Sequence, residues 1–491
     1  MYLELQGTDE LYVRLLRALR HAILQGRILP GAKMPSTRVL AQEHGLSRNT
    51  VLAAYEQLCA EHLAVTRVGS GTFVNERLPM PTRPRATTVL APASRYAARL
   101  REQSATITTQ RISGVRYDLQ YGEPLVDLPL FSTWRRSLLH AAMRTDARYP
   151  SPHGLLELRR EVAAYLGRRR GIECVADDIV VVNGTQQAVT LIARLLLDEG
   201  DTAVLEDPHY GLVAQCLRAH GAAVKYIAVG ADGLDARLVV GSGVRLVFVT
   251  PSHQFPSGVA MSLTKRLALL EAASERKFWI VEDDYDGEYG LEGRLLPALR
   301  SLDADDRVVY VGSFSKTMFP TLRLGYVVCP QALRADLVHA KRLADIASSG
   351  IEQAAMAHFM ASGGFDRHLR KAALELRRRR KALLEGVADH CGARVQIRES
   401  GAGMHCVGWL PKLSADNLRA LIELAASHSL GLHPIAPHYA RPPTMQGLLL
   451  GFAALSVPQL RVATRILGQC LDQLNVLVSK VKLPRDTVEQ H

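Results

Sequence analysis

The chain has 491 residues, of which 47% are apolar and 22% charged, a composition typical of folded, soluble proteins with two or three domains. It contains no run of about 18 apolar residues, and its N-terminus lacks a basic segment followed by an apolar one, so neither a membrane span nor secretion is expected. Its seven cysteines are scattered without a Cys-x-x-Cys pair. This favours a cytoplasmic protein and argues against zinc, and no metal site is predicted.

Most of the net charge of +12 lies near the N-terminus. Residues 1–116 hold 16 Lys and Arg against 8 Asp and Glu, whereas the rest of the chain holds 44 against 40. Two thirds of the positive excess therefore lies in less than a quarter of the sequence. A basic N-terminal module suggests a polyanionic partner.

Residues 1–75 predict three helices followed by a β-hairpin. Apolar side chains recur at helical spacing from residue 11 to residue 24, and two shorter helices are expected after Ser36 and Ser47, whose hydroxyls suit an N-cap. The apolar face of the first of these helices includes Val39 and Leu40, and the second carries Val51, Leu52, Tyr55 and Leu58. Gly69-Ser70-Gly71 then joins two β-rich runs, so the unit is predicted to be a winged helix-turn-helix.

Two groups of residues in this unit are expected to contact double-stranded operator DNA. One group begins the predicted recognition helix and can reach bases or phosphates: Arg48, Asn49 and Thr50. The other group would position the DNA backbone: Ser36, Arg38, Arg67 and Gly71. Leu40, Val51 and Tyr55 are predicted to belong to the core instead.

The remaining chain divides into a linker and a larger domain. Prolines at positions 79, 81, 84 and 92 mark residues 76–115 as a linker with one short helix around residues 94–103. Beyond it, short apolar runs alternate with helical segments, which predicts βαβ units and a mainly parallel sheet. The expected strands are Ile179–Val182, Ala203–Leu205, Leu246–Thr250, Phe278–Val281 and Val308–Val311. After about residue 330 we expect a smaller, mostly helical C-terminal subdomain, so that the second domain spans residues 116–480.

The last of these strands is followed by Ser313-Phe-Ser315-Lys316, with Arg323 seven residues beyond the lysine. A primary amine in this position can form an imine with an aldehyde, and Ser313, Ser315 and Arg323 can hold a dianionic phosphate. Pyridoxal 5′-phosphate (PLP) carries both groups, and proteins hold it through a lysine Schiff base. Lys316 is therefore the predicted catalytic lysine.

The preceding strand runs into Glu282-Asp283-Asp284-Tyr285-Asp286. A buried carboxylate opposite a pyridine nitrogen keeps that nitrogen protonated and makes the ring an electron sink. We assign this role to Asp283, with Asp284 as the competing assignment, and expect Tyr285 to hydrogen-bond the ring hydroxyl.

Three further segments complete the predicted cofactor site. Gly184, Thr185 and Gln186 lie where a strand meets a helix, and the free backbone N–H groups of such a helix N-terminus bind phosphate. Tyr210 follows another strand and can stack on the pyridine ring. In Thr250-Pro-Ser-His253-Gln254, either His253 or Gln254 could reach the ring oxygen, and His253 could equally be a second-sphere residue.

Two family resemblances cover almost the whole chain. Segments 29–41, 46–51 and 69–74 resemble the GntR-family DNA-binding domain, and residues 116–475 look like fold-type I aminotransferases. The phrases Thr-Pro-Ser-His-Gln-Phe-Pro-Ser-Gly, Glu-Asp-Asp-Tyr-Asp and Ser-Phe-Ser-Lys-Thr, joined to that head, resemble the MocR/GabR family of PLP-dependent transcription factors. The resemblance implies a mainly α winged-helix head, an α/β fold-type I domain with a smaller subdomain, a head-to-tail homodimer, and a small amine or amino-acid effector sensed through an external aldimine.

One departure from the family pattern concerns the effector. Members of this fold usually bind a substrate carboxylate through an arginine near the C-terminus, in a stretch that reads Arg-x-Gly/Ser-Phe/Tyr-Ala. Here the stretch is Leu449-Leu-Gly-Phe-Ala453, so leucine occupies the arginine position. Arg441 or another arginine could substitute, or the effector could lack an α-carboxylate. Two alternatives therefore stay open beside the regulator: a working aminotransferase with an appended head, and a sensor of PLP itself.

The basic run Arg377–Lys381 is interpreted as a solvated helix face.

Overall fold

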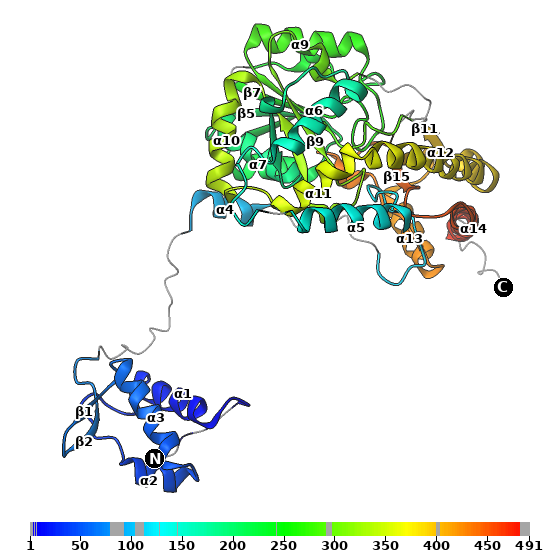
Figure 1. Ribbon diagram of the computed structural model, residues 1–491. Coiled ribbons are helices and arrows are strands. Elements are labelled where there is room, and N and C mark those ends of the chain that lie inside the picture. Colours follow the sequence, from blue (N-terminus) through cyan, green and yellow to red (C-terminus); the bar gives the residue numbers. More distant parts are fainter. Residues whose placement is uncertain are drawn as a thin grey trace, which may run out of the picture. The chain divides into compact units, whose positions relative to one another are not determined.

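The computed structural model describes residues 3, 5, 7–78, 93–103, 112–126, 128–144, 146–241, 243–290, 297–398 and 403–481. The chain divides into two compact units, residues 1–93 and 94–491, drawn in Figure 1. The four prolines of the predicted linker lie outside the described residues. The short helix expected near residue 94 is present as α4 (Arg95–Glu102), and within the larger unit it packs against the helix Gly211–Ala219.

The smaller unit has the predicted three helices and a hairpin. They are α1 (Leu11–Leu24), α2 (Thr37–His44), α3 (Arg48–Ala60), β1 (Ala64–Arg67) and β2 (Gly71–Val74). The Ser36 hydroxyl accepts a hydrogen bond from the Val39 N–H at 3.3 Å, and the Ser47 hydroxyl accepts one from the Thr50 N–H at 3.0 Å. Both predicted N-caps are therefore confirmed, and they fix where α2 and α3 begin.

The core of this unit confirms part of the expected pattern. Leu40, Val51 and Tyr55 are buried, and the Tyr55 hydroxyl donates to the Pro35 carbonyl at 2.8 Å. Val39, however, is 46% exposed, so its expected place on the apolar face of α2 is wrong, and Leu52 on α3 is 45% exposed. Consecutive helical residues point about 100° apart, and the core-facing side is already filled by their neighbours.

The larger unit is built on a seven-stranded sheet in the order β4-β10-β9-β8-β7-β5-β6. Only β10 runs antiparallel to its neighbours, so the predicted mainly parallel sheet is confirmed. The strands are β4 (Ile179–Val182), β5 (Thr202–Asp207), β6 (Ala223–Ala228), β7 (Val244–Val249), β8 (Trp279–Asp284), β9 (Val308–Ser313) and β10 (Gly325–Val328). Ile179 and Val181 pack in one buried cluster and Val180 and Val182 in another, because both faces of the sheet are covered.

Helices surround this sheet in Figure 1. Those that accompany it are α5 (Leu128–Ala142), α6 (Leu156–Arg170), α7 (Thr185–Leu196), α8 (Gly211–Ala219), α9 (Leu263–Arg276), α10 (Gln331–Asp345) and α11 (Gly350–Ala361). None of the described helices combines the length and the apolar character that crossing a membrane requires.

The C-terminal part forms the expected smaller subdomain, around a four-stranded antiparallel sheet in the order β11-β12-β15-β14. Its elements are α12 (Gly364–Cys391), β11 (Gln396–Arg398), β12 (His405–Leu410), α13 (Ala415–Ser427), β13 (Leu430–Gly431), β14 (His433–Pro434), β15 (Gln446–Gly451) and α14 (Val457–Val481). The segment that begins with β3 (Tyr117–Asp118) pairs with β13, and the Gly451 N–H donates to the Leu119 carbonyl at 2.9 Å. Residues near 120 are thereby held between the subdomain and the large sheet.

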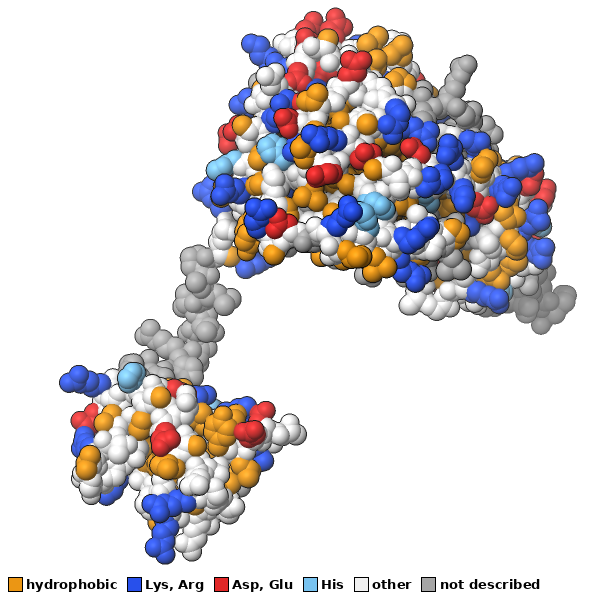
Figure 2. Space-filling view, viewed as in Figure 1, with side chains coloured by type: hydrophobic (Ala, Val, Ile, Leu, Met, Phe, Trp, Pro, Cys, Tyr) orange, Lys and Arg blue, Asp and Glu red, His pale blue; other side chains and the backbone are white. Residues whose placement is uncertain are grey.

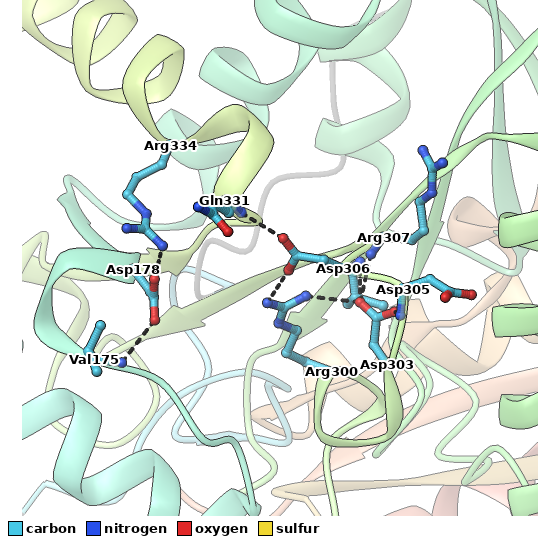
Figure 3. Close-up of polar contacts among 10 residues, drawn as sticks. Val175, Asp178, Arg300, Asp303, Asp305, Asp306, Arg307, Gln331 and Arg334 are labelled. Carbon is cyan, nitrogen blue, oxygen red and sulfur yellow. Dashed lines mark hydrogen bonds and ion pairs between the residues drawn. The ribbon is translucent and has the colours of Figure 1, made fainter.

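A polar network anchors the start of β9, as Figure 3 shows. Asp303 accepts hydrogen bonds from the Arg307 and Val308 N–H groups, each at 2.8 Å. Asp306 accepts from the Gln331 N–H at 2.7 Å, at the first residue of α10. The strand that ends near Lys316 is thus fixed at its other end to α10.

The contrast between Leu40 and Val39 gives a direct test of the winged-helix core. Leu40→Ala removes a fully buried side chain and should lower the free energy of unfolding by about 2–5 kcal/mol. Val39→Ala, one residue away but exposed, should change it by about 0.5 kcal/mol or less. Urea unfolding of a fragment of residues 1–78, followed by circular dichroism, measures both, and equal losses would contradict the assigned core.

Candidate cofactor site and DNA-binding surface

A cavity of about 840 Å³ lies at the carboxyl ends of β8 and β9. Parallel strands carry their ligand sites at this edge of the sheet. Nine of the ten residues predicted to bind the cofactor line this one cavity: Thr185, Gln186, Tyr210, Asp283, Tyr285, Ser313, Ser315, Lys316 and Arg323. The tenth, Gly184, is the N-cap residue of α7 directly beside them.

Lys316 lies three residues after the end of β9, and its Nζ donates to the Gly122 carbonyl. Burial lowers the pKa of this lysine below its usual range, while Asp286, Glu123 and Asp283 oppose that shift. A lysine with a lowered pKa is more often neutral, and only the neutral amine attacks an aldehyde.

The two candidate carboxylates at the end of β8 have different surroundings. Asp283 lines the cavity, and its Oδ1 has no hydrogen-bond partner among the described residues. Asp284 instead contacts the Arg170 guanidinium at 2.7 Å, with both side chains 1% exposed, and accepts from the Tyr310 hydroxyl at 2.7 Å. Consecutive strand residues point to opposite faces, so only the first of them is directed toward a ligand in the cavity. Burial, followed by repulsion from Asp284 and Asp286, raises the pKa of Asp283 to about 8.

Tyr285 also lines the cavity, but its hydroxyl is not isolated. It lies 2.8 Å from His253 Nδ1, which in turn lies 3.0 Å from an Asp286 carboxylate oxygen. Neither His253 nor Gln254 lines the cavity, and the Gln254 amide donates to the Pro208 carbonyl at 2.7 Å. Of the two alternatives for His253, the structure therefore favours the one in which it supports Tyr285 from behind.

The opposite end of the cavity offers donors suited to a phosphate. Thr185 and Gln186 begin α7, where backbone N–H groups and the helix dipole favour an anion. Arg323 donates from Nη2 to the Asn183 carbonyl at 2.8 Å. A side chain at Gly184 would approach the Arg323 guanidinium to 3.3 Å at a backbone φ of +83°, so this close approach favours glycine.

Tyr210 lies between these two ends as the N-cap residue of α8. Its ring meets Phe255 edge to face, with centroids 5.6 Å apart and planes at 81°. Phe255 lines the same cavity, so an aromatic wall runs along the side where a planar ring would lie.

Sequence reasoning missed the wall that the smaller subdomain and the segment near residue 120 contribute. It contains Gln120, Tyr121, Glu123, Phe131, Arg379, Met404, His405, Ser456 and Gln459. These residues come from five separate segments, and no short motif connects them. Gly122, at a φ of +75° within Tyr-Gly-Glu-Pro, was the one local signal of a turn here.

Arg379 corrects the interpretation of the basic run on α12. Arg377, Arg378 and Lys381 are exposed, as expected of a solvated face, and Lys and Arg side chains gather over this end of the molecule in Figure 2. Arg379 turns inward, lines the cavity, and donates from Nε to Glu375 at 2.8 Å. By contrast, Leu449 is fully buried and, like Arg441, does not line the cavity.

In the smaller unit, the predicted DNA contacts lie mostly on its surface. Ser36, Arg38, Arg48, Asn49, Arg67 and Gly71 are exposed, and Thr50 is half-buried. Thr50 is already used in the α3 cap, where its hydroxyl lies 2.7 Å from that of Ser47. Arg67 pairs with Glu76 at 2.8 Å and covers the Phe73 ring. Lys33, which sequence reasoning missed, forms an isolated β-bridge with Phe73, and its Nζ lies 5.8 Å from the centre of the same ring.

The residues present in the cavity fit PLP. A lysine amine, a buried carboxylate oxygen without a partner, and a helix N-terminus beside an arginine correspond to the aldehyde, the ring nitrogen and the phosphate of that cofactor. Lys316, Asp283 and Arg323 line one cavity, and the helix that begins with Thr185 and Gln186 reaches it as well.

Comparison with known proteins agrees with both units. Residues 11–74 match the bacterial regulatory proteins of the gntR family, and residues 117–444 match aminotransferase class I and II. The probable rhizopine catabolism regulatory protein MocR of Rhizobium meliloti is 34% identical over 91% of both chains. The regulator TauR of Rhodobacter capsulatus is 34% identical over 78% of this chain and 81% of its own.

Among solved structures, the α-aminoadipate aminotransferase LysN of Thermus thermophilus, complexed with N-(5′-phosphopyridoxyl)-L-leucine, superposes with a TM-score of 0.69. It is 27% identical and covers 78% of this chain and 98% of its own. The two matched regions define the class of protein: a bacterial transcription regulator with a winged-helix head and a PLP-dependent aminotransferase fold. The chain belongs to the MocR-type transcriptional regulators, and its cofactor is PLP.

The two carboxylates of β8 can be separated by experiment. Asp283→Ala should weaken PLP binding by about 3–5 kcal/mol, because a protonated ring would lose its buried counter-charge. Asp284→Ala should instead lower the free energy of unfolding by about 3–5 kcal/mol, because it removes the carboxylate from a buried ion pair with Arg170. PLP titration by absorbance and denaturant unfolding measure the two effects. The assignment is wrong if Asp284→Ala weakens PLP binding and Asp283→Ala does not.

Proposed function

We propose that this protein binds operator DNA through residues 1–75 and that a small amine or amino-acid-like effector sets its regulatory state by replacing Lys316 as the amine bound to the cofactor aldehyde. The observation that carries the proposal is the convergence of Lys316, Asp283 and Arg323 on one cavity in a chain with a gntR-family head. When bound, the cofactor supplies an aldehyde that reacts reversibly with primary amines.

The chain's own residues have distinct roles in this proposal. Lys316 supplies the amine that an effector amine displaces. Asp283 holds the proton of the ring nitrogen, and Tyr210 covers the ring face. Thr185, Gln186, Ser313, Ser315 and Arg323 bind the phosphate, with Gly184 giving them room. Tyr285, supported by His253, donates to the ring hydroxyl.

The effector would occupy the wall that contains Arg379, Ser456 and Gln459. Leu449 offers no charge there, because it is fully buried at the position where related enzymes carry a carboxylate-binding arginine. Arg379 is shared with Glu375 and with the Ala453 carbonyl, so its charge is partly neutralised. This supports a regulator that recognises its effector without efficient aminotransferase turnover.

A second candidate is a sensor of PLP itself. One relative, 27% identical over 91% of this chain and 93% of its own, is the pyridoxine biosynthesis transcriptional regulator PdxR of Corynebacterium glutamicum. In this case PLP alone would change operator binding, and added amines would have no further effect.

We also propose a head-to-tail homodimer in the cytoplasm. Large exposed apolar side chains on α5, just after its end and on α10 support an interface between aminotransferase-like units: Leu139 is 65% exposed, Met143 87% and Leu343 76%. Two heads per dimer would read two operator half-sites.

DNA binding gives the first test. Arg48→Ala should cost roughly 1–3 kcal/mol if this arginine reads a base, since it lies exposed at the first residue of α3. Arg377→Ala, equally exposed on the larger unit, is the matched control and should change operator affinity little. Fluorescence anisotropy at several salt concentrations measures both. Specific binding by a chain that lacks residues 1–75 would refute the proposal.

The lysine gives the second test. Lys316→Ala should still bind operator DNA, because its heads are intact, but amines should no longer alter that binding. An effector shifts two arrangements of a protein only through different affinity for them. Operator affinity and DNA bending, measured with PLP and a panel of amines, compare the variant with the wild type. An unchanged amine response in Lys316→Ala would exclude this lysine as the switch.

A further inference from the structure

A buried ion pair at the end of α10 is not used by any role assigned so far. The Lys341 side chain is completely buried, and its Nζ donates to both carboxylate oxygens of Asp345, at 2.6 and 2.7 Å. Burial lowers the pKa of Lys341, and Asp345 opposes that shift. Asp345 is also the last residue of α10, where a carboxylate faces the unfavourable end of the helix dipole.

Such a pair is poorly explained by stability alone. Removing two charges from water is costly, and apolar residues of similar volume often stabilise a protein as well or better. What the pair provides is a carboxylate held in one orientation, because Asp345 is fixed through both of its oxygens.

The fixed carboxylate reaches the segment in front of α7. Asp345 accepts hydrogen bonds from the Asn183 side-chain amide at 2.8 Å and from the Gln187 side-chain amide at 2.7 Å. The Gln187 amide oxygen then accepts from the Asn183 backbone N–H at 2.8 Å. These three contacts fix the residues on both sides of Gly184, Thr185 and Gln186.

The same segment also holds the arginine of the phosphate end. The Asn183 carbonyl accepts from Arg323 Nη2, so Asp345 is connected to the Arg323 guanidinium through a single residue. We propose that Asp345, oriented by Lys341, is a positioning residue for the cofactor phosphate. It presets the N-terminus of α7 and Arg323 before the phosphate arrives, and this inference rests on the cofactor site proposed above.

Comparing PLP with pyridoxal isolates this role. Pyridoxal has the same ring and aldehyde but no phosphate, so it keeps the contacts with Lys316, Asp283 and Tyr210. Asp345→Ala in the full-length protein should weaken PLP binding by about tenfold, the order expected when a charged hydrogen-bond partner is lost. The Kd for pyridoxal, measured by the same absorbance titration, should change by about twofold or less.

The chain offers a matched control at the other end of the same helix. Asp306 accepts from the Gln331 N–H at 2.7 Å and from Arg300 at 2.5 Å, as Figure 3 shows. Asp306→Ala therefore disturbs α10 without touching the phosphate end, and it should leave the ratio of the two Kd values unchanged. Asp345→Asn keeps the size of the side chain and one acceptor oxygen, and it should lose part of the preference for PLP over pyridoxal. This variant replaces Asp345→Ala in the test if the alanine variant does not fold.

The outcomes separate this inference from the cofactor site on which it rests. Arg323→Ala should reduce the preference for PLP over pyridoxal, and an unchanged preference would show that the phosphate end is misplaced and overturn both. If Arg323→Ala behaves as expected but the Asp345 variants bind both ligands as the wild type does, the inference about Asp345 alone is overturned. An equal loss of affinity for both ligands would likewise overturn it, since that reports general damage to the fold.

Discussion

Consecutive residues of a β-strand point to opposite faces of a sheet, and the end of β8 depends on this constraint. It directs Asp283 into the cavity and Asp284 into the buried contact with Arg170. The first carboxylate can then meet a ligand while the second stabilises the unit beneath it. Shifting the strand by one residue would exchange these roles.

Asp283 differs from the other buried carboxylates near the end of β8 in its hydrogen-bond partners. Glu282 accepts hydrogen bonds from the Leu299 and Arg300 N–H groups at 2.8 Å, and Asp286 contacts His253. Glu206, Asp284 and Glu288 each leave one oxygen without a partner among the described residues, but the other oxygen of each accepts a hydrogen bond. Asp283 also leaves an oxygen without a partner there, and no described residue donates to its other oxygen. Burying a charged group without a partner is costly, and the raised pKa of Asp283 reflects this. Natural proteins tolerate such a cost mainly at functional sites.

The sequence predicted the site best where reactive side chains lie just after the ends of predicted strands. Lys316 and Asp283 each lie within five positions of the end of a predicted strand, and parallel strands bring their carboxyl ends to one edge of the sheet. Arg323 was predicted from its place seven residues beyond Lys316. Local patterns could therefore predict that these residues converge. The N-caps Ser36 and Ser47 were predictable for a similar reason, because capping is a local interaction.

Features that depend on tertiary packing were not predictable in this way. Arg379 lies within a basic run on a long helix, and only the packing of α12 decides which arginine turns inward. Tyr121 and His405 reach the cavity from segments almost 300 residues apart. The Lys341–Asp345 pair looks like an ordinary i, i+4 surface pair in the sequence, and its burial depends on how α10 packs against α7. Val39 has the right hydrophobicity for the apolar face of α2, but its side chain points away from the core.

The central claim is that Lys316 is the residue that reacts with the cofactor aldehyde. The most direct measurement is borohydride reduction of the PLP-loaded protein, followed by proteolysis and mass spectrometry of the peptides. The account predicts one reduced pyridoxyl group, attached to Lys316, and its disappearance in Lys316→Ala. A pyridoxyl group on any other lysine of the wild-type protein would contradict the claim.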